Sequence, residues 1–396
     1  MSDFEVRPLR ADEHRAAADL FRGTLHRPPI TDAEWERLNP TRVSSSGLGA
    51  FDPDLIGVCR SFGDELTVPG GTRLPLAAVT TVGVRADRTR RGVLSALMAE
   101  QFADFARRGL PVALLHASEA TIYGRFGYGI ATLGRDYTID RRRARLRPDA
   151  PLSGEVSLLA FEEAVPRWPE LYAGLDHLRP GMLTRTAASW AISENFHRRF
   201  TAPVITAVHH GPRGADGFAV YTVELGETAV LHLTMLYYAT PEAFSGLWRH
   251  LLSVDLVDRI RTEARSVDEP IDLLLTDPRL VVTERAADES WLRLVDVPTA
   301  LAAREYPGDP VVIEVTDPVL PANSGRYRIS ADGAARTGDP AGLRLDAGTL
   351  AMAYLGTWRP STLASAGRIE VRDPAALAAA DRLFSTHAPA WCGTFF

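Results

Sequence analysis

A strand, a short break and an amphipathic helix follow one another twice in this chain, and this repeat constrains the fold most. The first copy is Ala78–Val84 with Arg91–Arg108, and the second is Thr228–Tyr238 with Pro241–Val254. In both helices apolar residues recur at helical spacing, and both strands are rich in β-branched residues. The repeat predicts a structural duplication. The second copy lacks the Arg-Arg-Gly loop of the first, so we expect it to be degenerate.

The N-terminal part, residues 1–140, alternates strand, two helices, three strands, a helix, a strand, a turn and a final strand. We predict a turn at Ser44–Gly49 and a hairpin at Gly70-Gly71. The extended segments near this hairpin are Leu55–Ser61, Glu65–Val68 and Leu74–Val84. In the second cycle, Ile271–Leu275 is predicted to be a buried strand.

The length of 396 residues exceeds what one ordinary core accommodates, so we expect more than one domain. The alternation of strands and helices indicates an α+β fold of mixed α/β character. The predicted boundaries give domains at 1–145, 146–290 and 291–396, the first boundary falling at an arginine run followed by Pro, Gly and Ser.

Composition excludes several classes of protein. Hydrophobic content of 45% and charged content of 24% are typical of a soluble globular chain, and no apolar run is long enough to span a membrane. A net charge of −6 disfavours a nucleic-acid partner. Cys59 and Cys392 are the two cysteines, so we expect no disulfide framework and no metal site. Without the basic start and apolar stretch of a secretory signal, a cytoplasmic location is expected.

The stretch VTTVGVRADRTRRGVLSAL, Val79 to Leu97, carries the clearest chemistry. A strand ends, and Arg90-Arg91-Gly92 then opens a helix, whose free N–H groups and dipole attract phosphate. The loop is neither a Walker nor a Rossmann loop, since GxxxxGK[ST] and GxGxxG are absent. From the residues alone, a pyrophosphate cradle and an ordinary loop with solvated arginines are about equally supported.

A second stretch, HASEATIYGRFGYG, follows a strand and places two tyrosines among glycines. Gly124 and Gly127 are predicted to shape a bend that aims Tyr123. We interpret Tyr128 as a packing group, and His116 as a satisfied histidine at the core or its rim.

The two stretches resemble the GNAT superfamily, and more specifically the Eis family of acetyltransferases. The GNAT loop motif is matched imperfectly, with Thr89 at its first position and Leu94 at its last. The resemblance covers the whole chain, which ends in an aromatic tail. It implies an N-terminal GNAT domain, a second, degenerate GNAT domain and a C-terminal domain similar to sterol carrier proteins. It also implies acetyl-CoA as co-substrate, an amine acceptor such as an aminoglycoside, another polyamine or a peptide, and a homohexamer.

The resemblance also assigns roles to individual residues. Tyr123 would protonate the departing thiolate, and the C-terminal carboxylate of Phe396 would act as general base. Trp35 could border the amine pocket, although an ordinary amphipathic helix explains it equally well. Residues expected to hold the coenzyme are Val82, Gly83 and Val84 by their main chain, Arg90, Arg91, Gly92, Val93, Leu94 and Ser95 at the pyrophosphate, and Ser118 and Glu119 on the next strand.

One alternative belongs to another class. The third domain could bind an apolar ligand as a carrier or interaction protein, with the GNAT loops as relics. The intact Arg90-Arg91-Gly92 loop argues against this interpretation.

Overall fold

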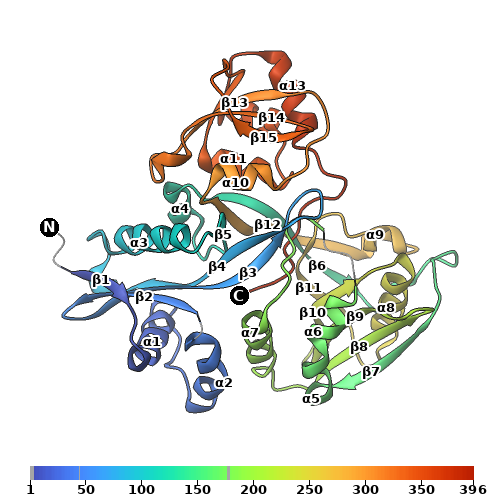
Figure 1. Cartoon of the computed structure of the whole chain (residues 1–396). Helices are drawn as coiled ribbons and strands as arrows, with labels where there is room; N and C mark the ends of the chain where they lie inside the picture. Colours follow the sequence, from blue (N-terminus) through green and yellow to red (C-terminus); the bar gives the residue numbers. More distant parts are fainter. Residues whose placement is uncertain (1–3, 44, 176–178) are drawn as a thin grey trace. The chain divides into compact units, whose positions relative to one another are not determined.

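The computed structural model describes residues 4–43, 45–175 and 179–396 (Figure 1). The chain divides into two compact units, each built from segments that are distant in sequence. The larger unit contains the described residues up to Thr132, with Pro180–Asn195 and Glu289–Phe396. The smaller unit contains the described residues of Leu133–Arg179 and Phe196–Asp288.

The first sheet of the larger unit has the strand order β1-β2-β3-β4-β5-β12. Neighbouring strands are antiparallel except β4 and β5, which are parallel. Only the end of β12 takes part here, where Trp291–Leu294 pairs with β5. The strands are β1 (Glu5–Pro8), β2 (Ser46–Asp52), β3 (Asp54–Thr67), β4 (Arg73–Val84), β5 (Val112–Leu115) and β12 (Val281–Leu294).

Helices cover both faces of this sheet. Gly57 of β3 lies against Val93 and Leu97 at the start of α3, whereas Gly83 of β4 lies against Thr24 at the end of α1. Because Val58, not Gly57, pairs with Gly83, these two glycines face opposite sides of the sheet. The helices here are α1 (His14–Thr24), α2 (Asp32–Val43), α3 (Val93–Arg107) and the short α4 (Ala120–Tyr123).

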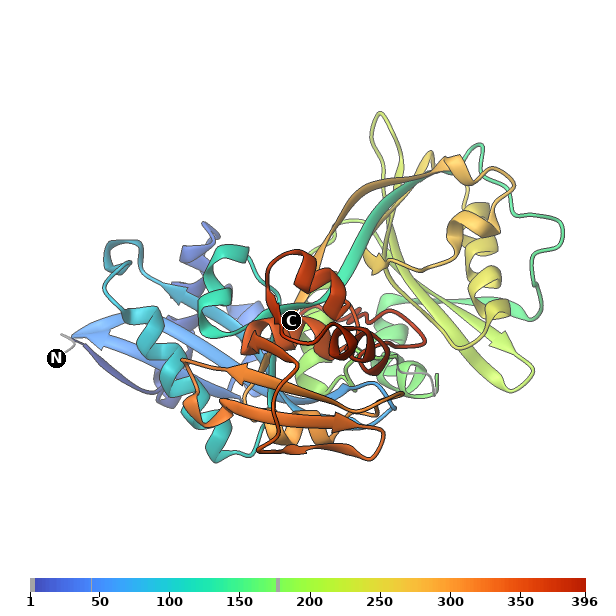
Figure 2. The same ribbon diagram turned by 90° about the horizontal axis from the view of Figure 1, so that it is seen from above.

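The C-terminal part of the larger unit forms a separate five-stranded sheet in the order β15-β14-β13-β16-β17, orange in Figure 2. Its helix α11 is almost wholly buried, and Gly348 in its first turn lies against the backbone of Tyr128. The strands are β13 (Val311–Thr316), β14 (Gly325–Ser330), β15 (Gly333–Arg336), β16 (Leu343–Asp346) and β17 (Ile369–Val371). The helices are α10 (Val297–Ala302), α11 (Ala347–Tyr354), α12 (Pro360–Ser365) and α13 (Pro374–Leu383).

The smaller unit has its own sheet, in the order β6-β11-β10-β9-β8-β7. Here β10 and β11 are parallel, as β4 and β5 are in the larger unit. The units β4–α3–β5 and β10–α8–β11 are therefore equivalent, which confirms the predicted duplication. The strands are β6 (Gly129–Asp140), β7 (Glu155–Ala160), β8 (Val204–Gly211), β9 (Gly214–Glu224), β10 (Val230–Tyr238) and β11 (Arg259–Ser266). The helices are α5 (Phe161–Ala164), α6 (Trp168–Ala173), α8 (Pro241–Ser253) and α9 (Ile271–Leu274), while α7 (Ala187–His197) begins in the larger unit.

Some local predictions were wrong. The described part of the predicted turn at Ser44–Gly49 starts strand β2, because pairing with β3 overrides the turn tendency of Ser and Gly. The two segments Leu55–Ser61 and Glu65–Val68 join into the single strand β3. Ile271–Leu275, predicted as a strand, is mostly the one-turn helix α9, since a short apolar run fits either structure. The hairpin is confirmed, with positive φ at Gly70 and Gly71.

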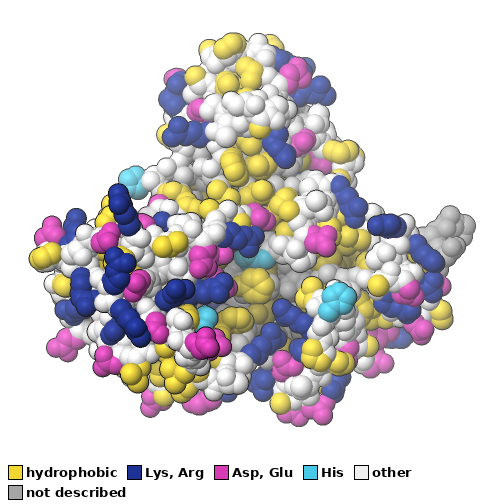
Figure 3. Space-filling model, turned by 180° about the vertical axis from the view of Figure 1, so that it is seen from behind, with side chains coloured by type: hydrophobic (Ala, Val, Ile, Leu, Met, Phe, Trp, Pro, Cys, Tyr) yellow, Lys and Arg dark blue, Asp and Glu magenta, His cyan; other side chains and the backbone are white. Residues whose placement is uncertain are grey.

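On the face shown in Figure 3, arginine and acidic side chains are interspersed. On this face, therefore, the charges do not gather into a large patch of one sign. None of the helices in the described part of the chain is long and apolar enough to cross a membrane.

Candidate active site

The loop after β4 ends at a helix start that no side chain closes. Gly92 is the N-cap of α3, with φ of 83°, and it makes no side-chain cap. A left-handed φ of this kind favours glycine, and the preceding Arg90 also has a positive φ of 62°. The N–H groups of the first helical turn and the positive end of the helix dipole are therefore available to an anion.

Four arginines lie on this loop, and they fall into two pairs. Arg85 binds Asp87 at 2.8 Å, and Arg88 lies 3.5 Å from Asp52. For Arg90 and Arg91, which are exposed, no ion pair is found within residues 4–43, 45–175 and 179–396. The arginines nearest the open helix start are thus the ones not neutralised by protein carboxylates.

The equivalent helix of the second copy starts differently. The hydroxyl of Thr240 accepts a hydrogen bond from the N–H of Ala243, and Pro241 in the first turn has no N–H to offer. This helix start is closed by the chain itself. The second copy therefore lacks the open helix start of the first, which agrees with the expectation that it is degenerate.

Strand β4 is deformed just before the loop. Thr80 pairs with Arg60 and Gly83 with Val58, so Thr81 and Val82 together oppose Cys59 in a bulge. Thr81 has φ of 55°, which is unusual for a β-branched residue and costs about 1–3 kcal/mol. No local pattern predicts this bulge, because threonine normally favours a regular strand.

The two central parallel strands pair over a short length only. Their register runs from Leu76–Val112 to Ala78–Leu114, whereas β4 continues to Val84. Among the described residues, the β5-facing edge of β4 beyond Ala78 therefore has no strand partner. The main chain of Val82, Gly83 and Val84 can offer hydrogen bonds to an extended ligand along this edge.

Tyr123 ends the short helix α4, and its side chain is only 6% exposed. Burial raises the pKa of its phenol to about 12, so the hydroxyl stays protonated at neutral pH. Its ring packs edge-on against Tyr128, with centroids 5.9 Å apart. Tyr128 is buried among apolar residues, as predicted for a packing group.

The bend that carries Tyr123 depends on one glycine of the predicted two. Gly127 has φ of 81°, whereas Gly124 has φ of −57° and lies in ordinary helical conformation, so the prediction for Gly124 was wrong. Ser118 and Glu119 were expected on a strand, but β5 ends at Leu115 and both lie exposed in the connection to α4. Glu119 instead precedes this helix as its N-cap residue.

The C-terminal tail packs its last ring into the larger unit. Phe396 is 7% exposed. The centroid of its ring lies 5.6 Å from that of Phe62 and 4.9 Å from that of His116. The preceding Phe395 is 70% exposed. His116 is held by hydrogen bonds at both ring nitrogens, as expected for a satisfied histidine. Burial raises the pKa of the Cys392 thiol well above its usual range, so this cysteine is not a reactive thiolate.

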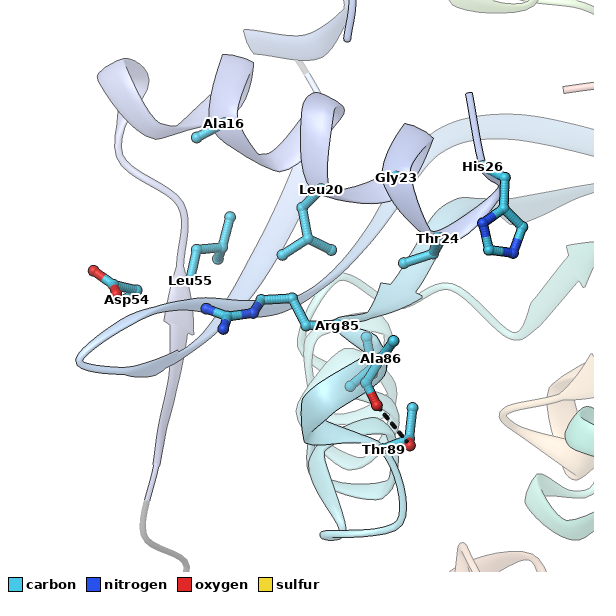
Figure 4. A pocket seen from close by; sticks show the side chains of 11 residues that line it. Ala16, Leu20, Gly23, Thr24, His26, Asp54, Leu55, Arg85, Ala86 and Thr89 are labelled. Carbon is cyan, nitrogen blue, oxygen red and sulfur yellow. Dashed lines mark hydrogen bonds between the residues drawn. The ribbon is translucent and has the colours of Figure 1, made fainter. Parts of the chain in front are cut away.

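Trp35 lies on α2, half-buried against a small apolar cluster that contains Ala18 of α1, Leu38 of α2 and Ile30 from the connection between the two helices. Beside α1, a cavity of about 640 Å³ opens at the end of β4 (Figure 4). Its lining comes from α1, the start of β3 and the loop after β4, where the Thr89 hydroxyl donates a hydrogen bond to Ala86 at 3.1 Å. Within the described residues, no group of three His, Cys, Asp or Glu side chains could hold a metal ion.

Comparison with known proteins agrees with this architecture. Residues 5–131 and 181–294 match acetyltransferase (GNAT) domain families, and residues 297–393 match a sterol carrier protein domain family. The N-acetyltransferase Eis of Mycobacterium tuberculosis (strain ATCC 25177 / H37Ra) is 35% identical over 376 residues, which cover 91% of each chain. The chain belongs to the Eis family of N-acetyltransferases. It therefore has two GNAT domains followed by a domain similar to sterol carrier proteins.

Other relatives and solved structures are also similar to this chain. An uncharacterized N-acetyltransferase of Streptomyces coelicolor is 37% identical, with 98% of each chain covered. The crystal structure of Eis1 from Mycobacterium abscessus superposes with a TM-score of 0.90 at 38% identity, covering 99% of this chain and 100% of that one. A GCN5-related N-acetyltransferase from Anabaena variabilis, at 20% identity and a TM-score of 0.86, shares the fold. Enzymes of the GNAT fold use acetyl-CoA as acetyl donor.

Proposed function

We propose that this Eis-family enzyme transfers the acetyl group of acetyl-CoA to a primary amine, with aminoglycosides or other polyamines as acceptors and peptides as a further class. The observation that carries the proposal is the open start of α3 beside Arg90 and Arg91, neither of which has an ion pair in the described part of the chain. A pyrophosphate is bound by free main-chain N–H groups at a helix start and by arginine side chains, and this site offers both. The names of the relatives support the reaction type but not the acceptor.

In this proposal the coenzyme lies along the open edge of β4. The main chain of Val82, Gly83 and Val84 would bind its pantetheine arm and polarise the thioester carbonyl. Residues proposed to hold the pyrophosphate are Arg90, Arg91, Gly92, Val93, Leu94 and Ser95. Ser118 and Glu119 would flank the coenzyme from the β5–α4 connection, and Trp35 would border the amine pocket.

The proposed reaction forms a C–N bond and breaks the C–S bond of the thioester. The amine nitrogen attacks the carbonyl carbon, the carboxylate of Phe396 accepts the amine proton, and the phenol of Tyr123 gives its proton to the departing sulfur. A free aliphatic amine, with a pKa near that of lysine at about 10.4, is mostly protonated at neutral pH, which is why a base is required. The raised pKa of Tyr123, about 12, keeps its acid form available.

The deciding experiment measures acetyl-CoA turnover with a panel of aminoglycosides, linear polyamines and peptides, alongside acetyl-CoA binding by calorimetry. We expect micromolar acetyl-CoA binding and turnover with at least one multiply charged amine. Deleting Phe396 should abolish turnover and leave coenzyme binding largely intact. Tight coenzyme binding without turnover on any amine would contradict the proposed acceptor class.

A ligand carrier is the second candidate, and the match of residues 297–393 to a sterol carrier protein domain is what favours it. Calorimetry separates the two, because a carrier with relic GNAT loops would not bind acetyl-CoA at micromolar concentration. We further propose a cytoplasmic homohexamer, which sedimentation velocity tests directly.

A further inference from the structure

The carboxylate of Glu289 holds the main chain of the C-terminal tail. Glu289 lies at the point where β12 enters the larger unit, and it is 8% exposed. One of its oxygens accepts the N–H of Cys392 at 3.0 Å, and the other accepts the N–H of Gly393 at 2.7 Å. Hydrogen bonds from a main-chain N–H to a charged carboxylate are stronger than those between neutral groups.

His116 joins the same residue to the tail one position further on. Its Nδ1 lies 2.7 Å from the carbonyl oxygen of Glu289, and its Nε2 lies 2.8 Å from the carbonyl oxygen of Thr394. Carbonyl oxygens only accept, so both bonds form together only when both ring nitrogens carry a proton. His116 therefore bridges β12 and the tail, and the ring of Phe396 rests on it.

The tail turns sharply between these contacts. Gly393 has φ of 64°, and a Cβ there would meet the ring of Trp391 at 2.5 Å, so a larger residue does not fit. The N–H of Trp391 is itself bonded to the carbonyl of Pro180 at 2.9 Å. The tail is thus fixed on both sides of the turn, immediately before Phe396.

We propose that Glu289 is a positioning residue, which with His116 fixes the C-terminal carboxylate of Phe396 for proton transfer. The inference rests on the proposed function, in which that carboxylate is the general base. The packed ring of Phe396 holds the side chain of this residue, but the direction of its carboxylate also depends on the main chain before it. A misplacement of about 1 Å can cost about 10²-fold in rate. The two amides held by Glu289 constrain that main chain.

The test compares Glu289→Gln with Glu284→Gln in the full-length chain. Glu284 is exposed on the same strand and serves as the matched control. The amide nitrogen of glutamine donates, so in E289Q one tail N–H loses its acceptor. We expect kcat to fall by about 10²-fold in E289Q, the Kd for acetyl-CoA to change less than twofold, and carboxypeptidase A to release Phe396 faster. E284Q should match the unsubstituted enzyme in all three measurements.

Glu289→Asp provides a second variant if E289Q does not fold. It keeps the charge but shortens the reach, so we expect a kcat between those of E289Q and the unsubstituted enzyme. Unchanged kcat in a folded E289Q or E289D, while deletion of Phe396 abolishes turnover, overturns the role of Glu289 alone. Turnover that survives deletion of Phe396 overturns the general-base assignment, and the positioning role with it.

Discussion

The ring of Tyr123 stands edge-on to that of Tyr128, with the ring centroids 5.9 Å apart. Tyr128 is the more deeply buried of the two, at 2% exposed against 6%. The hydroxyl of Tyr128 is buried, and no hydrogen-bond partner for it is found among the described residues. Tyr123 and Tyr128 belong to one motif and their rings are in contact, so replacing each with Phe gives a matched pair of variants.

Replacing Tyr123 with Phe should reduce kcat by about 10²–10⁴-fold, the range typical of a lost general acid. Tyr128→Phe removes a hydroxyl without a described partner, so it should leave kcat within a few-fold and stability unchanged or slightly improved. Steady-state kinetics on both variants check this. Equal kcat losses would show that packing, and not acid catalysis, explains the motif.

The pH dependence of kcat offers a separate check on Tyr123. Its protonated form is the proposed active form, and burial raises the pKa to about 12, so activity is lost only as pH rises through that value. We expect no alkaline limb in kcat between pH 7 and pH about 10.5. A limb near pH 10 that disappears in Tyr123→Phe would contradict the raised pKa.

Substituting Arg90 or Arg91 with Ala should raise the Kd for acetyl-CoA about tenfold or more, since a charge-assisted hydrogen bond contributes about 1.5–3 kcal/mol. The kcat at saturating coenzyme should change little, because the contact lies away from the reacting atoms. Arg88→Ala is the control, since Arg88 lies on the same loop but is 3.5 Å from the carboxylate of Asp52 at the end of β2. Calorimetry measures the Kd for acetyl-CoA in all three variants. An equal rise in Kd for Arg88→Ala would mean that the substitutions disturb the loop as a whole, which would contradict a specific role of Arg90 and Arg91.

A stability prediction concerns Arg304 in the C-terminal domain. Its buried guanidinium donates to the carbonyls of Tyr354 and Leu383, among others, at the ends of α11 and α13. Arg304→Met leaves these carbonyls unsatisfied and should destabilise the fold by about 3 kcal/mol or more. The exposed Arg328→Met on β14 should change stability by less than about 0.5 kcal/mol. Urea unfolding followed by circular dichroism measures both, and equal midpoints would refute the role of Arg304.

The sequence predicted those features that local patterns encode. Helix α3 follows from apolar spacing, its open start from Arg90-Arg91-Gly92, and the burial of Tyr128 from its place in a segment that becomes strand. The bulge at Thr81 could not be predicted, because a threonine with positive φ contradicts its own propensity.

Contacts between residues that are far apart in the sequence could not be predicted from local sequence patterns either. Glu289 is one of many acidic residues, and only the fold brings it to Cys392 and Gly393. Likewise, β11 was missed: its charged residues alternate with uncharged ones, but Ile260 is the only large apolar residue among them, so the strand signal is weak. Both gaps arise where distant segments, and not local sequence, determine the structure.

The pairing of β5 with Trp291–Leu294 has a consequence for synthesis of the chain. When Val112–Leu115 leaves the ribosome, the strand that completes its sheet has not been translated, so one edge of β5 lacks its neighbour. Most of the smaller unit must emerge before that neighbour arrives. The nascent N-terminal domain is therefore exposed to intermolecular strand pairing during translation, and expression at low temperature or with a co-expressed chaperone should raise its soluble yield.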